Sequence, residues 1–230
     1  MDHLQLKQSL VDAIRMMEQA KLVDYNGHCS VRIPGTNQIF INSGACSRSA
    51  LTVEDIVTMD LDGNVIEGKD SPPLEYHIHT EIYKRRNDVQ SVARSIPQWA
   101  MYFSMTDTPL EPVIVQGALL GRVQTFPKVT SVNTKQLGSE LAEILGNEKV
   151  VLIKSHGAVT VGQSLLESFV LSIYMEENAR RYYESTRLGK PYVLNEQEVQ
   201  AAIQNLWKPG LLQRVWNFYY SKLDSVRNTI

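Results

Sequence analysis

The sequence predicts a single α/β domain, because helical and strand-like segments alternate along a chain of suitable length for one core. The chain has 230 residues, of which 43% are hydrophobic and 21% charged. These proportions are those of an ordinary globular protein. The sequence contains no internal repeat or low-complexity tract. We therefore expect one domain over residues 1–230, ending in a helical tail at 191–230.

The first half of the chain predicts helices separated by short strands. Leu6, Leu10 and Ile14 recur at helical spacing, and a turn at Pro34-Gly35 separates two β-rich runs. A helix is expected just past Pro72-Pro73, because proline is favoured at the start of a helix. The expected elements are a helix at Leu4–Ala20, strands at Cys29–Ile33 and Gln38–Asn42, a helix start at Thr52–Asp55, a short run Ile56–Leu61, a helix at Leu74–Arg85, a strand at Ser91–Ala93 and a helix at Pro97–Ser104.

The second half predicts one buried strand and several helices. Val150–Ile153 is apolar throughout, which favours a strand buried on both faces. Glycines end two of the helices, at Gly146 and Gly189. The expected helices are Thr134–Leu145, Ser164–Arg187, Glu196–Leu206 and Leu211–Lys222.

Charge and cysteine content narrow the classes of partner and compartment. The formal net charge is −2, so nothing draws the chain toward nucleic acid or an anionic membrane. Two cysteines without a C-x-x-C pair favour a reducing compartment. The N-terminus has no secretory pattern, and no stretch approaches the roughly 18 apolar residues of a membrane span. We expect a cytoplasmic protein with a small-molecule ligand.

Polar residues gather at the ends of predicted elements, where functional groups are often held. Gly27-His28-Cys29-Ser30 opens a strand, and its backbone amides are suited to an anion, although the segment is equally well explained as a turn. Glu75, in the first turn of its helix, is either functional or complements the helix dipole. His156 follows a buried strand and precedes a glycine, and it is either a cleft residue or a satisfied core histidine.

His77 and His79 invite a metal site, but their spacing argues against it. Residues two apart on a helix point about 200° away from each other. The pair therefore cannot chelate one ion together, as His-x-His on a strand can.

Four motifs, in this order and spacing, resemble the class II aldolase/adducin superfamily over about Leu4 to Tyr183. The motifs are Gly27-His28-Cys29-Ser30-Val31-Arg32, Ser43-Gly44, Pro72-Pro73-Leu74-Glu75-Tyr76-His77-Ile78-His79 and Ser155-His156-Gly157-Ala158-Val159. The tail segment 214–220 is similar to the decarboxylase and antibiotic-biosynthesis branch. The resemblance implies a three-layer αβα fold with a central, mainly antiparallel sheet.

The resemblance also implies a divalent metal, usually zinc, held by a His-x-His pair and a third histidine beside a glutamate acid/base. Glu75 matches that glutamate and His156 the third ligand. The His-x-His positions fall on Arg94-Ser95-Ile96, so two ligands are missing, and too few remain for a tight zinc site. We therefore expect no metal cofactor.

Arg94 brings a permanent positive charge and forked donors to the first ligand position. It suits a carboxylate or an enolate oxygen if it faces the pocket, and otherwise it forms a surface salt bridge. The Ser-Ser pair that binds phosphate in sugar-phosphate aldolases is Pro73-Leu74 here, which argues against a sugar phosphate. The expected substrate contacts are His28, Ser30, Ser43, Gly44, Arg48 and His79.

The leading prediction is a metal-independent lyase acting on a small carbonyl-containing carboxylic acid through an enolate. Glu75 would shuttle the proton, and Arg94 and His156 would contact the oxyanion or the carboxylate. Two alternatives stay open: a non-catalytic, adducin-like binding or scaffold protein, and a lyase that keeps a metal through His79, His156 and Glu75. The resemblance further implies a homotetramer with pockets between subunits.

Overall fold

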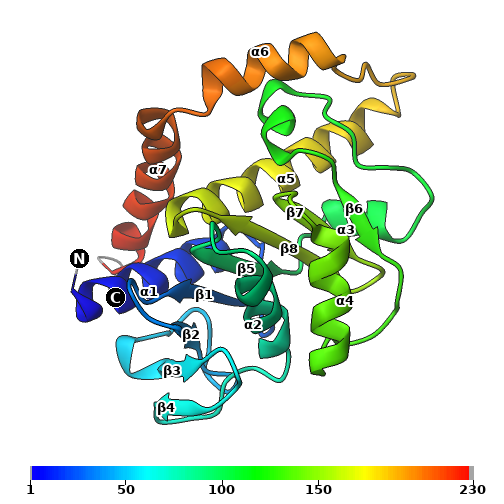
Figure 1. The fold of residues 1–230 in the computed structure, drawn as a ribbon. Coiled ribbons are helices and arrows are strands. Elements are labelled where there is room, and N and C mark those ends of the chain that lie inside the picture. Colours follow the sequence, from blue (N-terminus) through cyan, green and yellow to red (C-terminus); the bar gives the residue numbers. More distant parts are fainter. Residues whose placement is uncertain (1, 228–230) are drawn as a thin grey trace.

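The computed structural model describes residues 2–227 and has the predicted three-layer α/β architecture (Figure 1). Eight strands form one sheet in the order β4-β3-β2-β1-β5-β8-β7-β6. Neighbouring strands are antiparallel except β6 and β7, which run parallel. The strands are β1 His28–Arg32, β2 Gln38–Asn42, β3 Ile56–Asp60, β4 Val65–Glu67, β5 Ser91–Ser95, β6 Gln124–Phe126, β7 Val150–Ile153 and β8 Gly157–Gly162.

Helices cover both faces of this sheet. The helical segments are α1 His3–Gln19, η1 Val53–Asp55, α2 Tyr76–Arg85, α3 Ala100–Ser104, η2 Val115–Leu120, α4 Lys135–Leu145, α5 Leu165–Ser185, α6 Glu196–Leu206 and α7 Pro209–Arg227. On one face, α2 and α4 pack together over the sheet, with Ile82 and Leu141 in one buried apolar cluster. On the other face, α1, α5 and α7 bury residues such as Ile14 and Phe169. The confirmed mainly antiparallel sheet thus lies between two helical layers.

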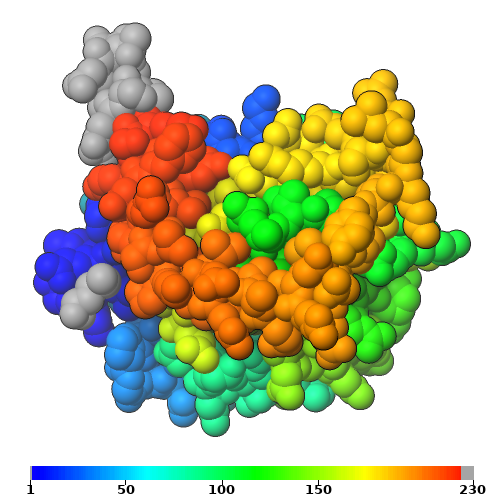
Figure 2. All heavy atoms as spheres, turned by 90° about the horizontal axis from the view of Figure 1, so that it is seen from above, coloured from blue at the N-terminus to red at the C-terminus, as the bar shows by residue number. Residues whose placement is uncertain are grey.

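The C-terminal tail forms a ridge along one side of the molecule. Figure 2 shows α6 and α7 in orange to red, beside η2 in green and α5 in yellow. Trp216 of α7 packs edge-on against the ring of Phe169 in α5. The end of the predicted tail, residues 228–230, and Met1 lie outside the described part of the chain. Within the described part, no helix is long and apolar enough to cross a membrane.

Several elements differ from the sequence-based expectation. The helix start at Thr52 yields only the single 3-10 turn η1, because the chain enters β3 directly after it. The helix expected from Pro97 begins at Ala100. Short or irregular segments were missed. These are β4, with three exposed residues, β6, with three residues, the 3-10 segment η2, and β8, whose glycine- and threonine-containing sequence is buried throughout.

The strand register brings one end of three central strands together. His28, the first residue of β1, pairs with Arg94 near the end of β5. Ser95 of β5 pairs with Ala158 of β8, directly after the turn that carries His156. The N-terminus of α2 lies at this same end, where Glu75 is the N-cap residue. These four segments, distant in sequence, form the candidate site.

Candidate active site

A cavity of about 700 Å³ opens at this end of the sheet, and Glu75 lies at its floor. The residue is 9% exposed. Its Oε1 accepts hydrogen bonds from the Ser131 hydroxyl at 3.0 Å and the Val132 amide at 2.9 Å. Glu75 precedes the first residue of α2 and caps none of that helix's amides with its side chain. A role in complementing the helix dipole therefore does not by itself explain the position of Glu75, because groups from other segments bind its carboxylate.

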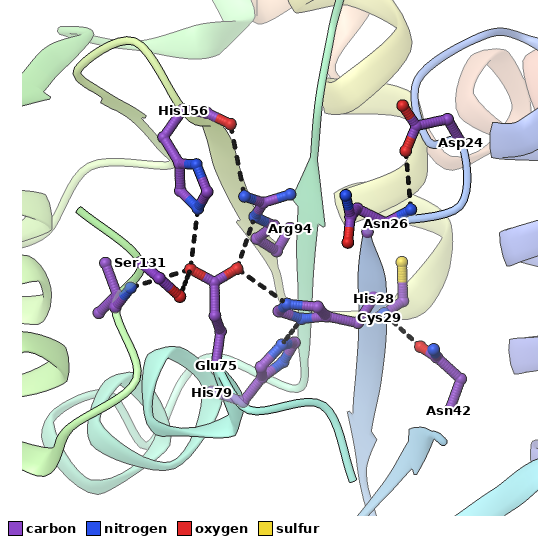
Figure 3. Close-up of polar contacts among 12 residues, drawn as sticks. Asp24, Asn26, His28, Cys29, Asn42, Glu75, His79, Arg94, Ser131 and His156 are labelled. Atoms are coloured by element: carbon purple, nitrogen blue, oxygen red, sulfur yellow. Dashed lines mark hydrogen bonds and ion pairs between the residues drawn. The ribbon is translucent and has the colours of Figure 1, made fainter. Parts of the chain in front are cut away.

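Arg94 points into the cavity and pairs with Glu75 (Figure 3). Its Nε lies 3.2 Å from Glu75 Oε2. The side chain is buried, which rules out the alternative of a surface salt bridge. Its Nη2 donates to the His156 carbonyl over 3.4 Å. The buried Nη1 group of this cation has no hydrogen-bond partner among the described residues.

His156 reaches the same carboxylate from the turn between β7 and β8. Its Nε2 lies 3.0 Å from Glu75 Oε1, and a third of its side chain is exposed to the cavity. The following Gly157 has a φ of +153°, and a Cβ there would lie 2.3 Å from the Ser95 carbonyl oxygen. Only glycine allows β5 and this turn to approach so closely, which is how Arg94 and His156 come to share Glu75.

These contacts decide the protonation state of Glu75. Burial raises the pKa of the carboxyl, but hydrogen bonds from His156 and His28 and the charge of Arg94 outweigh it and hold the pKa well below its usual range. Glu75 is therefore a carboxylate in the resting site. His28 lies behind it, with Nε2 at 3.5 Å from Glu75 Oε2. Burial is the main cause that lowers the pKa of His28 to about 4, so its ring is neutral at pH 7.

The expected substrate contacts divide into two groups. His28, Gly44 and Arg48 line the cavity. Ser30, Ser43 and His79 do not line it and are fully buried. The expectation that these three contact substrate is therefore wrong, and the reason is local packing. Both ring nitrogens of His79 are already engaged, by His28 and Ser30 at 2.6 Å each.

Two further expectations need correction. Arg48 donates to the carbonyl oxygens of Gly27 and Cys46, so much of its guanidinium holds two loops together beside the cavity. The Cys29 backbone amide does not serve as part of an anion site, because it donates to the Asn42 side chain at 2.9 Å. The positive charge nearest to Glu75 is thus that of Arg94.

The sequence reading missed Ser131 and Val132, which bind Glu75, and the wall formed by Asp24, Asp70 and Met101. Apart from Met101, which lies in α3, these residues lie in loops without a motif or periodicity. No signal in a single sequence links such loops to Glu75, because the fold alone brings them to it.

The donor set of this site does not fit a divalent metal. Across residues 2–227, no group of three or more histidine, cysteine, aspartate or glutamate side chains is placed to hold one ion. A guanidinium stays protonated and has no lone pair to donate, so Arg94 cannot act as a ligand. His79 has no free nitrogen to join Glu75 and His156, and the alternative of a rearranged metal site loses its third ligand.

Residues 8–183 match the family described as Class II Aldolase and Adducin N-terminal domain. An L-fuculose phosphate aldolase of Methanococcus maripaludis is 27% identical over 73% of this chain and 90% of its own length. A 3,4-dihydroxyphthalate decarboxylase of Arthrobacter keyseri is 26% identical over 81% of each chain. A solved L-fuculose 1-phosphate aldolase superimposes with a TM-score of 0.83, at 25% identity, over 90% of this chain and 99% of its own.

Proposed function

Because the chain belongs to the class II aldolase and adducin family, we propose that it is a lyase acting on a small carbonyl-containing carboxylic acid through an enolate. In this proposal the protein works without the family's metal. Glu75 moves the proton, while Arg94 and His156 bind the developing oxyanion or the substrate carboxylate. The observation that carries the proposal is a buried carboxylate at a cavity floor, beside a guanidinium whose Nη1 is unpaired.

Because Glu75 is ionised in the resting site, it is able to accept a proton from a bound substrate. In an aldol-type cleavage, Glu75 accepts the proton of a hydroxyl group on the carbon β to the carbonyl. The bond between the α and β carbons then breaks, and its electron pair forms the enolate. Glu75 returns the proton to the α carbon. In a decarboxylation the same bond breaks with loss of carbon dioxide, and the enolate takes a solvent proton through Glu75.

Arg94 supplies the electrostatic part of this mechanism. The Nη1–H group is buried and already oriented, so it stabilises negative charge without the reorganisation that water requires. His156 lies on the exposed side of Glu75 and offers its ring to the same ligand. Arg94 carries one positive charge where a divalent metal carries two. The site therefore suits an acid whose enolate is already delocalised by neighbouring groups.

The cavity wall favours a carboxylic acid over a sugar phosphate. Pro73 has no amide hydrogen to donate, and Leu74 is 80% exposed beside the cavity. Neither side chain provides the hydroxyl donors that a Ser-Ser pair offers to a phosphate group. The relatives named as fuculose phosphate aldolases therefore share the fold with this chain, whereas the relative named as a decarboxylase is the better guide to the substrate class. The open cavity also favours an enzyme over a scaffold, which has no need of it.

A panel of β-hydroxy and β-keto carboxylic acids, with L-fuculose 1-phosphate as comparison, tests the proposal. Release of aldehyde or carbon dioxide is measured with wild type and with Glu75→Gln, in the presence of a chelator and after addition of zinc. We expect turnover of an acid that survives the chelator and is lost in the variant. Turnover of the sugar phosphate alone, or only with added zinc, would overturn the proposal.

A further inference from the structure

Five side chains form one row of polar contacts between α2 and β1, leading from Glu75 into the core. Four of them, from His28 to Tyr83, are joined by hydrogen bonds, and His28 Nε2 lies 3.5 Å from Glu75 Oε2 without another partner among the described residues. Glu75, His79 and Tyr83 are four residues apart and so share one face at α2. His28 and Ser30 are two residues apart and share one face of β1. Residues of the two elements alternate along the row, in the order Glu75, His28, His79, Ser30, Tyr83 (Figure 3 shows the first three).

The contacts in this row are short and secluded. His28 Nδ1 lies 2.6 Å from His79 Nε2, His79 Nδ1 lies 2.6 Å from Ser30 Oγ, and Ser30 Oγ lies 2.8 Å from the Tyr83 hydroxyl. All four residues behind Glu75 are buried. None of the last three lines the cavity. They are therefore too deep to touch a substrate and can act only through His28.

The hydrogen bonds in the row have one consistent direction. A carboxylate only accepts hydrogen bonds, so a His28 ring that serves Glu75 across the 3.5 Å between them presents Nε2–H to it. A neutral His28 then has a bare Nδ1, which must accept the proton on His79 Nε2. The bare Nδ1 of His79 must in turn accept from the Ser30 hydroxyl, which accepts from Tyr83. Burial raises the pKa of Tyr83, so its phenol stays protonated and remains a donor.

We propose that His79, Ser30 and Tyr83 are positioning residues that lock His28 as an Nε2–H donor to Glu75. The lock keeps His28 on Oε2 and so fixes the orientation of the carboxylate at the cavity. This inference rests on the proposed role of Glu75 as the proton carrier. The alternative is a charged His28 that donates from Nδ1 to His79 and reverses the row. Burial of a second cation beside Arg94 opposes it.

The location of a single proton distinguishes the two directions without any substrate. Protein labelled with ¹⁵N in its histidines is examined at pH 7 by long-range ¹H–¹⁵N NMR. We expect the proton shared by the two rings to be bonded to His79 Nε2, with His28 Nδ1 bare. A proton bonded to His28 Nδ1 would overturn the proposal. His77→Gln, on the same helix but outside the row, serves as a control and should leave these signals unchanged.

A kinetic arm uses an acid that the wild type turns over. His79→Leu should lower kcat about three- to tenfold, the net value of one hydrogen bond, and move the acid limb of the pH profile upward. His79→Gln keeps an N–H near the Nε2 position and should restore part of both. An unchanged acid limb in His79→Leu would refute the positioning role. Absence of turnover in the wild type would count against the proposed function and leave the proton location as the test.

Discussion

The pairing of Arg94 with Glu75 predicts a coupling energy that a surface ion pair lacks. The two charges lie 3.2 Å apart, and both side chains are almost fully buried. With an effective dielectric constant of about 20, Coulomb's law gives an attraction of roughly 5 kcal/mol before desolvation is subtracted. Removing one partner of a buried pair typically costs about 3–5 kcal/mol. We expect Arg94→Met to lower the free energy of unfolding by that amount.

A double-mutant cycle isolates the interaction. Arg94→Met, Glu75→Leu and the double variant are unfolded in urea at one protein concentration, and the coupling energy is expected at about 2–3 kcal/mol. Lys7 and Glu67 provide a matched control. Their atoms lie 3.4 Å apart, but Glu67 is 71% exposed, so the same cycle should give below about 1 kcal/mol. Equal coupling in the two cycles would refute the reasoning.

The sign of the pH dependence follows from the lowered pKa of Glu75. The folded pKa lies below the ordinary value of 4.5. The contribution of Glu75 to stability is therefore fully present above that value and is lost as the pH falls through the folded pKa. In Arg94→Met the pKa of Glu75 rises, and protonation then relieves the unpaired charge. The stability difference from wild type should shrink between pH 7 and pH 4, and a constant difference would contradict the assignment.

Four other outcomes are expected. Glu75→Gln should keep the fold and the binding of an acidic substrate while lowering turnover by about 10²-fold or more, measured by steady-state kinetics beside a binding assay. Elemental analysis should find no stoichiometric zinc, iron or manganese, and one metal per chain that survives dialysis and is lost in His156→Ala would contradict this. Sedimentation should show a homotetramer, whereas a monomer at micromolar concentration would refute it. Gly157→Ala should lower the thermal midpoint, because its Cβ would meet the Ser95 carbonyl at 2.3 Å, and an unchanged midpoint would show that the turn can yield.

The sequence predicted the parts of the site that sit on recognisable motifs. Glu75 and His156 were singled out by their places at element ends and by the family resemblance, and Arg94 by the ligand position it occupies. The structure places Arg94 Nε 3.2 Å and His156 Nε2 3.0 Å from the carboxylate oxygens of Glu75. Their catalytic roles stay predictions. The contact of Ser131 with Glu75 was not predicted, because the loop of Ser131 has neither a period nor a motif. Its distance from Glu75 depends on how α4 packs on α2.

The failure over Ser30, Ser43 and His79 has a physical cause as well. The position of a residue in a motif indicates that it lies near a site. It does not indicate whether the side chain lines the cavity or lies behind the residues that line it. Burial decides that, and it depends on the register of β1 against its neighbours and on the docking of α2. The geometric argument that separated His77 from His79 did hold, since His79 is fully buried and His77 remains partly exposed.

The row of five side chains shows where sequence reasoning stops. The spacing within each element can be recognised in the sequence. Glu75, His79 and Tyr83 are four residues apart and share a helix face, and His28 and Ser30 are two residues apart and share a strand face. Neither the α2 set nor the β1 set forms the row by itself. They become one only because β1 lies beneath α2 at a height that sets His28 between Glu75 and His79. A shift of β1 by one residue would turn both of its polar side chains to the opposite face of the sheet and leave His79 and Tyr83 without partners in the core.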